Sequence, residues 1–187
     1  FALSIALSLL LSGCGLFTSP AAVHQEIEAT FERGDVREAS VAADRALVRF
    51  SRDPEWQWRF RILQARLLVY RSDYNGALAL LRDAPPQSLQ STDIPLRRSM
   101  VQGMAYRVAQ DFVNSATSIS FAENLASREH PEALCEVLNA KAALEASEQR
   151  YADAQATYEQ ARTLARRAGQ SYQEAGALIG LAWVAIG

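Results

Sequence analysis

The sequence predicts an all-α protein, and three observations support this. A short motif, a turn residue followed by a large apolar residue, begins at Asp35, Asp73, Asp111 and Arg150, so it recurs every 38–39 residues. Small residues recur at fixed distances after each copy. From about residue 21 onward there is no convincing alternation of β-branched residues and no Asn-Gly or Asp-Gly signal between strand-like runs. A period of this size is typical of stacked helical repeats. We therefore expect an α-solenoid of antiparallel helix pairs.

Four columns of residues recur in the second helix expected in each unit. They are a large apolar column (Val36, Tyr74, Phe112, Tyr151), a small column (Ala39, Ala77, Ser115, Ala154), an apolar column (Ala43, Leu81, Ile119, Tyr158) and a second small column (Ala46, Ala84, Ala122, Ala161). Small residues let two helix backbones approach closely, while larger side chains fill the adjoining gap. The columns therefore predict packing positions and nothing chemical.

Boundary signals separate the expected helices. Asp35 is predicted to cap a helix, with Glu38 completing a capping box, and Asp53-Pro54-Glu55 is predicted to start the next one. Further boundaries are expected at Pro85-Pro86, Pro95, His130-Pro131 and Gly169. The first helices are less regular: Ala65, Gly103 and Ala142 keep a small residue nine places before the aromatic, whereas Ile27 replaces it in the first copy. Ser171 to Gly187 is expected to form the first helix of a fifth unit.

The columns resemble the tetratricopeptide repeat (TPR) over about Ala21 to Gly187. The resemblance implies a right-handed α-solenoid of about four and a half repeats whose first helices line a concave face. The period is longer than the family's usual value of about 34 residues, and the tryptophan, leucine and glycine of the family's first helix are mostly not in their usual places. The array is therefore described as TPR-like, and neighbouring α-solenoid families remain alternatives.

The amino-terminal segment predicts a lipid anchor. Phe1 to Leu11 is an uncharged apolar run, shorter than the roughly 20 residues that span a bilayer. It ends in Leu11-Ser12-Gly13-Cys14, which resembles the lipobox of bacterial lipoproteins. The resemblance implies cleavage after Gly13 and acylation at Cys14, and several acyl chains give a durable anchor. The alternatives are an ordinary signal peptide or a truncated membrane helix. The expected division is a signal segment over 1–13, a tether over 14–20 and a helical repeat domain over 21–187.

The expected location is the bacterial cell envelope, with the protein facing the periplasm or the outer surface. Gly15 stands where an aspartate would suggest inner-membrane retention, which favours the outer membrane. The chain is interpreted as a fragment, because Phe1 is not an initiator methionine and an apolar pattern continues to the last residue. The net charge of −2 gives no reason to expect a nucleic-acid partner.

Residues with catalytic potential are few. His24 and Glu28 lie one helical turn apart and are interpreted as part of a solvated helix face, and His130 as an ordinary loop residue. Cys135 lies in an apolar helical pattern and is predicted to be a buried small hydrophobe. A Cys135–His130 pair would lack an orienting third group and an oxyanion site. With no Gly-rich phosphate loop and no metal-spaced cluster, the sequence predicts no enzymatic activity in these residues, no cofactor, no metal and no small-molecule substrate.

The resemblance places a partner-binding groove on the first helices. Carried over by register, eight residues of the second and third units would line it: Arg59, Ile62, Arg66, Tyr70, Arg97, Met100, Met104 and Arg107. Arginines together with an aromatic residue and two methionines could hold an acidic, partly apolar segment. The alternative is that the arginines only solubilise this face, with their stems covering apolar neighbours.

The function expected from these features is that of a lipid-anchored protein-interaction scaffold of the cell envelope, which binds a protein or peptide in its groove and the membrane through Cys14. Two alternatives stay open. Degenerate arrays with a period near 40 are similar to those that precede CHAT domains, so the chain could be the regulatory part of a larger caspase-like peptidase whose catalytic domain lies beyond Gly187. It could also be an outer-membrane assembly lipoprotein.

Overall fold

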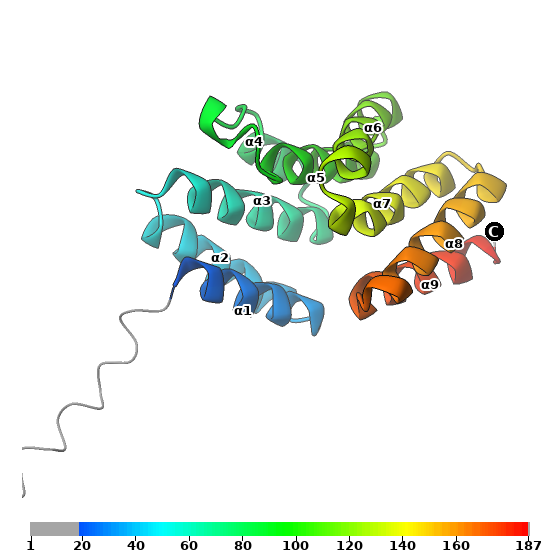
Figure 1. The fold of residues 1–187 in the computed structure, drawn as a ribbon, viewed down its shortest axis with the longest axis horizontal. Helices are drawn as coiled ribbons and strands as arrows, with labels where there is room; N and C mark the ends of the chain where they lie inside the picture. The colour runs from blue at the N-terminus through cyan, green and yellow to red at the C-terminus, as the bar shows by residue number, and fades with distance from the viewer. Residues whose placement is uncertain (1–18, 187) are drawn as a thin grey trace, which may run out of the picture.

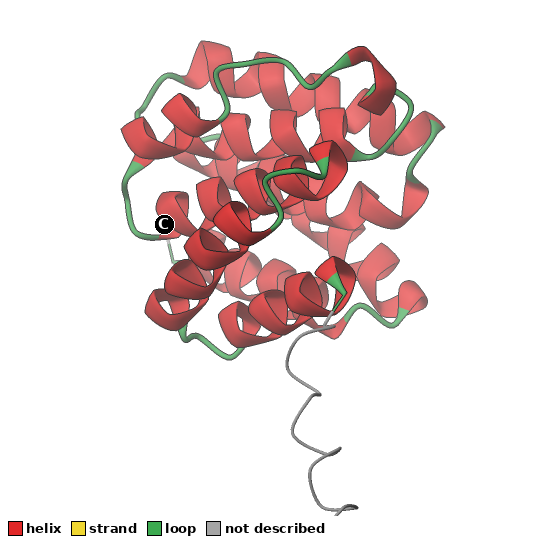
Figure 2. Ribbon diagram, turned by 90° about the vertical axis from the view of Figure 1, so that its left-hand side faces the viewer, coloured by secondary structure: helices red, strands yellow, loops and turns green. Residues whose placement is uncertain are grey.

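The computed structural model describes residues 19–186, and every regular element in this part of the chain is a helix (Figure 2). The α-helices are α1 (Pro20–Glu32), α2 (Val36–Arg49), α3 (Pro54–Tyr70), α4 (Tyr74–Leu80), α5 (Ile94–Val108), α6 (Phe112–Arg128), α7 (Leu134–Ser147), α8 (Tyr151–Ala168) and α9 (Ser171–Val184), with short 3-10 helices η1 (Gln87–Leu89) and η2 (Pro131–Ala133). The prediction of an all-α protein is confirmed. Within the described residues, no helix is both long and apolar enough to cross a membrane.

A recurring turn underlies the sequence motif. The residue just before each motif has a positive φ, namely Gly34 (93°), Ser72 (62°), Gln110 (61°) and Gln149 (63°). The next amide then donates a hydrogen bond back to the carbonyl five residues earlier, as Asp73 does to Leu68 at 2.9 Å. This is the Schellman arrangement that ends a helix with a left-handed residue. The motif therefore marks the tight reversal between two antiparallel helices.

Aspartate side chains cap the first turns of α3, α4 and α6. Asp53 accepts hydrogen bonds from the amides of Glu55 (3.1 Å) and Trp56 (3.2 Å), as the sequence predicted. Asp73 and Asp111 cap α4 and α6 in the same way. The predicted cap at Asp35 is wrong, because its side chain makes no such bond. There the preceding left-handed residue is a glycine with a larger φ, which gives the turn a different geometry.

The predicted columns are mostly buried. The first small column is fully buried in all four copies, and the apolar column is buried as well. The second small column fails at Ala84, which is exposed because α4 ends at Leu80. Pro85 also disfavours helical geometry at Ala84, the residue before it. The large apolar column is only partly buried, and Tyr151 is exposed.

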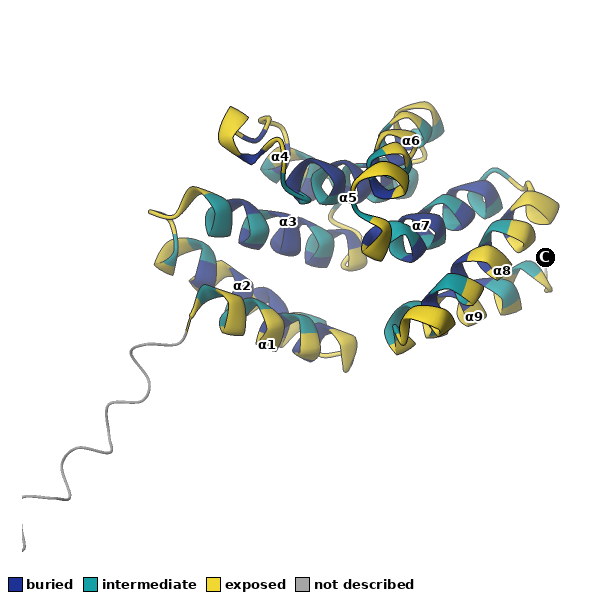
Figure 3. Cartoon of the chain, viewed as in Figure 1, coloured by how far each residue is buried: buried dark blue, intermediate teal, exposed yellow. Residues whose placement is uncertain are grey.

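The helices follow an arc in which α1 and α9, the first and last described helices, face one another (Figure 1). Buried residues line the contacts between neighbouring helices, while many exposed residues lie along α6 and α8 (Figure 3). The side chain of Tyr172 in α9 reaches the core of the first helices, with its ring centroid 6.1 Å from that of Phe31 in α1. The arc is therefore tied across its open side by an aromatic contact.

The amino-terminal predictions lie outside the described residues. This applies to the signal segment 1–13, to Cys14 and to all but the last two residues of the tether 14–20. The first helix begins at Pro20, inside the predicted tether, and is capped by the hydroxyl of Ser19, which accepts a hydrogen bond from the amide of Ala22 at 3.2 Å.

Candidate functional site

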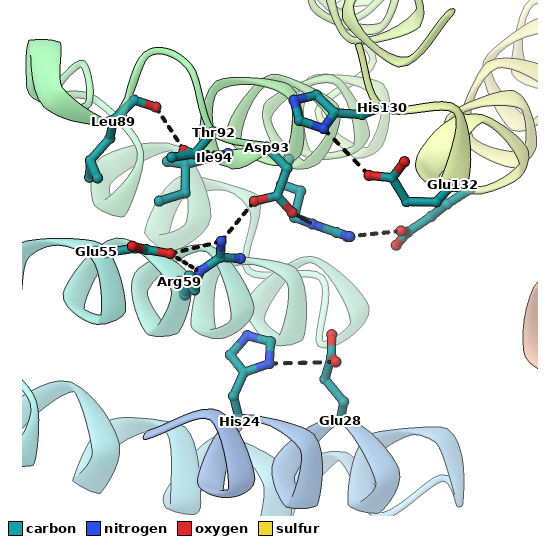
Figure 4. Close-up of polar contacts among 12 residues, drawn as sticks. His24, Glu28, Glu55, Arg59, Leu89, Thr92, Asp93, Ile94, His130 and Glu132 are labelled. Carbon is teal, nitrogen blue, oxygen red and sulfur yellow. Dashed lines mark hydrogen bonds and ion pairs between the residues drawn. The ribbon is translucent and has the colours of Figure 1, made fainter. Parts of the chain in front are cut away.

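The arginines predicted for the groove are mostly neutralised by acidic residues of neighbouring helices. Asp93 lies between Arg59 and Arg97, with its Oδ1 3.0 Å from Nη2 of Arg59 and its Oδ2 bonded to Nε of Arg97 (Figure 4). Glu136 of α7 in turn lies 3.2 Å from Nη1 of Arg97 and 3.3 Å from Nη1 of Arg66. Glu28 of α1 lies 3.8 Å from Arg66. We call these six residues the arginine–carboxylate network.

The network favours the charged forms of Asp93, Arg66 and Arg97. Burial would raise the pKa of Asp93, but the hydrogen bond and charge of Arg97 and the charge of Arg59 outweigh it, so the pKa is lowered. Burial likewise opposes the charge of Arg66 and Arg97, yet Glu136 raises the pKa of both. Three cations face three anions, and Glu55 adds a further carboxylate beside Arg59 at 3.0 Å. The network therefore has no unpaired positive charge for an acidic partner.

Two other residues predicted for the groove are buried. Ile62 and Met100 are buried in the central core, so neither offers free surface. Together with Arg59, Arg66 and Arg97 they border a small cavity of about 250 Å³ between α1, α3 and α5. This part of the predicted groove is therefore a small cavity lined largely by paired charged side chains.

The other predicted groove residues, with Arg66 again among them, line a larger cavity. It has a volume of about 860 Å³ and is bordered by α3, α5, α7 and α9, and by Tyr151 and Tyr158 of α8. We call it the inner cavity. The predicted residues that it includes are Arg66, Tyr70, Met104 and Arg107.

Residues of α7 and α9 make up most of the remaining wall, and the sequence analysis did not name them. Small residues of both helices line it: Ala140, Ala143, Ala146, Ala175, Gly176 and Gly180. Large apolar side chains of α9 and the residues after it project beside them, with 63% of Ile179, 76% of Trp183 and 86% of Ile186 exposed. The apolar run of 175–186 was the available signal.

Exposed apolar side chains gather at this cavity. Tyr70, Tyr151, Ile179, Trp183 and Ile186 all line it, and they are half of the large apolar residues exposed in the described chain. Exposed apolar residues that occur singly need no explanation, whereas large exposed apolar patches are typical of interaction sites.

Arg107 differs from the other arginines of the predicted groove. Its Nη1 donates a hydrogen bond to Oγ of Ser147 at 3.4 Å, and in the described chain it has no ion pair with a carboxylate. Its charge also acts on Tyr158, where burial raises the pKa and Arg107 opposes the rise. Of the cations that line the inner cavity, Arg66 is paired and Arg107 is not.

His24 does not occupy the surroundings expected for it, whereas His130 lies in a turn, as expected. His24 packs against the rings of Trp56 and Phe60, with centroids 6.0 and 5.6 Å away, and its Nδ1 lies 3.5 Å from Glu28. Its interpretation as part of a solvated face is wrong, because α1 packs this side chain against α3. His130 lies in the turn before η2, with its Nδ1 3.4 Å from Glu132.

Cys135 is buried, as predicted, and its thiol donates a hydrogen bond to the side chain of Gln170. Burial, and then the charge of Glu136, raise the pKa of the Cys135 thiol, which is the opposite of what a nucleophilic thiolate requires. No group of three His, Cys, Asp or Glu residues in the described chain is placed to hold a metal ion.

No family model, curated protein or solved structure matches this chain. The case for a function therefore rests on the residues of the site.

The raised pKa of Tyr172 makes the stability of the protein depend on pH in the alkaline range. Burial raises the pKa of Tyr172 to about 12, Tyr70 adds to the rise and Arg66 opposes it. The unfolded chain releases this proton near the ordinary value of about 10. Stability linked to Tyr172 is therefore fully present below about pH 10 and is lost as the pH rises to about 12.

Urea unfolding between about pH 9 and about pH 11.5 should then show a smaller loss of stability for Tyr172→Phe than for the parent chain. Tyr106→Phe, a change outside this cluster, serves as the control and should follow the parent. Parallel curves for Tyr172→Phe and the parent would contradict the prediction.

Proposed function

We propose that this chain is a protein-interaction module, a right-handed α-solenoid of about four and a half TPR-like units of 38–39 residues, which binds a segment of a partner protein in the inner cavity. A residue with a left-handed backbone conformation stands before each motif, and this recurrence supports the repeat interpretation. So does the complete burial of the first small column.

The observation that carries the proposal is the gathering of exposed apolar side chains at one cavity. Tyr70 and Trp183 project from α3 and α9, helices far apart in the sequence, into the same space. Leaving such a group in contact with water costs about 25 cal/mol for each Å² of apolar surface. A partner that covers it recovers this free energy, and no catalytic group has to be present.

Site-specific photo-crosslinking tests this function. A photo-reactive amino acid at position 179, inside the inner cavity, should form adducts with a partner protein in cells that carry the whole chain. The same amino acid at position 113 on α6 is the control, because Val113 is at least as exposed as Ile179 and lies outside both cavities. Equal adducts at the two positions, or none at position 179, would count against the proposal.

We further propose that the module is held at the membrane of a bacterial envelope by acyl chains on Cys14. The motif Leu11-Ser12-Gly13-Cys14 supports this. Metabolic labelling with a palmitate analogue should mark the parent chain and leave Cys14→Ser unlabelled. Label that persists in Cys14→Ser would refute the anchor without affecting the binding proposal.

A further inference from the structure

The ionic groups that line the inner cavity leave a single charge to be matched. Arg66 and Glu136 neutralise each other at 3.3 Å. Arg107 retains a full positive charge and is held only by the hydroxyl of Ser147. A ligand that brings one carboxylate to Arg107 would form a charge-assisted hydrogen bond, which is about twice as strong as a neutral one. A ligand with several acidic groups would find no further unpaired cation among the lining residues.

The walls of the cavity favour a ligand whose own backbone is already hydrogen-bonded. Asn139 of α7 donates from Nδ2 to the backbone carbonyl of Gln173 in α9 at 2.9 Å, so this donor and this acceptor are already engaged, while Oδ1 of Asn139 is buried without a hydrogen-bond partner. The other wall residues of α7 and α9 are mainly alanine, glycine, isoleucine and tryptophan. An extended peptide would bury unpaired amide and carbonyl groups against such walls. A helix satisfies these groups internally.

The volume of the inner cavity is large enough for a short α-helix. An α-helix with its side chains is about 10 Å across and rises about 1.5 Å per residue, so a volume of this size holds roughly two turns. The small side chains of Ala140, Ala143 and Gly176 allow a helix backbone to approach closely. Ile179 and Trp183 stand beside them and can cover the apolar face of such a helix.

We infer that the inner cavity receives a short amphipathic helix of a partner protein, whose apolar face lies against α7 and α9 and whose single Asp or Glu carboxylate pairs with Arg107. This inference rests on the proposed function and narrows it. The arginine–carboxylate network takes no part in recognition. Its role is to hold α1, α3, α5 and α7 together beside the cavity.

The test uses a defined probe, a fluorescein-labelled peptide of about ten residues with a lactam staple that holds it helical. It carries leucines on one face and a single glutamate at the edge of that face. Its neutral counterpart has glutamine in place of the glutamate, and an unstapled counterpart contains a central proline. Fluorescence anisotropy measures the binding of each peptide to the whole chain.

The glutamate peptide should bind about tenfold more tightly than the glutamine peptide, because a charge-assisted hydrogen bond is about twice as strong as a neutral one. Arg107→Gln should abolish this difference, whereas Arg37→Gln, a change on the exposed side of α2, should leave it intact. Ile179→Glu should weaken both stapled peptides. The proline peptide should bind at least tenfold more weakly than either.

Each of the following outcomes would overturn the inference. If the glutamate and glutamine peptides bind equally tightly, Arg107 does not recognise a carboxylate. If the proline peptide binds as tightly as the stapled peptides, the ligand need not be helical. Self-association of the chain in sedimentation that Trp183→Ala abolishes would make a second copy the occupant. If none of the peptides binds while crosslinks still form at position 179, this inference fails and the proposed function stands. If crosslinks are also absent, both fail.

Discussion

Replacing Glu136 with glutamine is expected to lower the free energy of unfolding by about 3 kcal/mol, the lower end of the range for breaking a buried ion pair. Glu136 of α7 holds Arg97 of α5 at 3.2 Å and Arg66 of α3 at 3.3 Å, so one carboxylate joins three helices. Its loss leaves both cations without this partner in surroundings that are largely closed to water. The lower end applies because 16% of the Glu136 side chain and 32% of that of Arg97 remain exposed.

Chemical denaturation of the parent chain and of Glu136→Gln measures this effect. Glu159→Gln is the matched control, because Glu159 forms a pair with Arg162 at 3.1 Å on the surface of α8. Exposed pairs contribute about 0–1 kcal/mol, so the control should stay within that range of the parent. If the two variants lose the same amount, the arginine–carboxylate network does not stabilise the fold in the way proposed.

Ala77→Leu is expected to disrupt folding, at a cost of about 1–3 kcal/mol or more. Ala77 belongs to the first small column and is completely buried between α4 and its neighbours in the central core. A leucine there adds volume that the packed core cannot accept without shifting α4. The fraction that still folds should bind the stapled peptides as the parent does, because Ala77 does not line the inner cavity.

Ala79→Leu controls for the helix itself. Ala79 lies two residues further along α4 and is exposed, so the same change there meets no packed neighbour. Thermal unfolding should place Ala79→Leu close to the parent and Ala77→Leu well below it. Comparable melting temperatures for the two variants would show that the column does not mark a packing position.

Part of the fold could be predicted because its signals are local. The aspartates at positions 53, 73 and 111 satisfy amides two or three residues away, a contact that needs nothing from the rest of the chain. The small columns were visible because close helix packing requires small side chains wherever it occurs. The exception at Ala84 was also local in origin, since Pro85-Pro86 follows it, but the competition between column and proline was not resolved from the sequence.

Other features had no local signal. Ser72, Gln110 and Gln149 adopt a left-handed conformation that favours glycine, and nothing in these side chains announces it. The helix pairs on either side hold each turn in place, so packing decides the backbone there. His24 was likewise interpreted as solvated, because the sequence does not show that the rings of Trp56 and Phe60 in α3 pack against it.

For the candidate site, the sequence indicated several of the residues but not the ion pairs that they form. The sequence identified the arginines and the apolar residues of the predicted groove by register. It did not identify Glu28 and Glu136 as partners of these arginines, because both lie on other helices, 70 residues away in the case of Arg66 and Glu136. It also missed Asp93, although Asp93 lies only four residues before Arg97. It also omitted Ile179 and Trp183.

The sequence by itself determined that the chain is helical, where most of its helices begin and which small residues are buried, because these depend on spacing and on neighbours within a turn. Only the tertiary structure decided which arginines are neutralised and which cavity stays open and apolar. Charge pairing and cavity shape depend on side chains that folding brings together from α1, α3, α5, α7 and α9. For this reason Arg107, one of four similar arginines in the sequence, stands apart only in the folded protein.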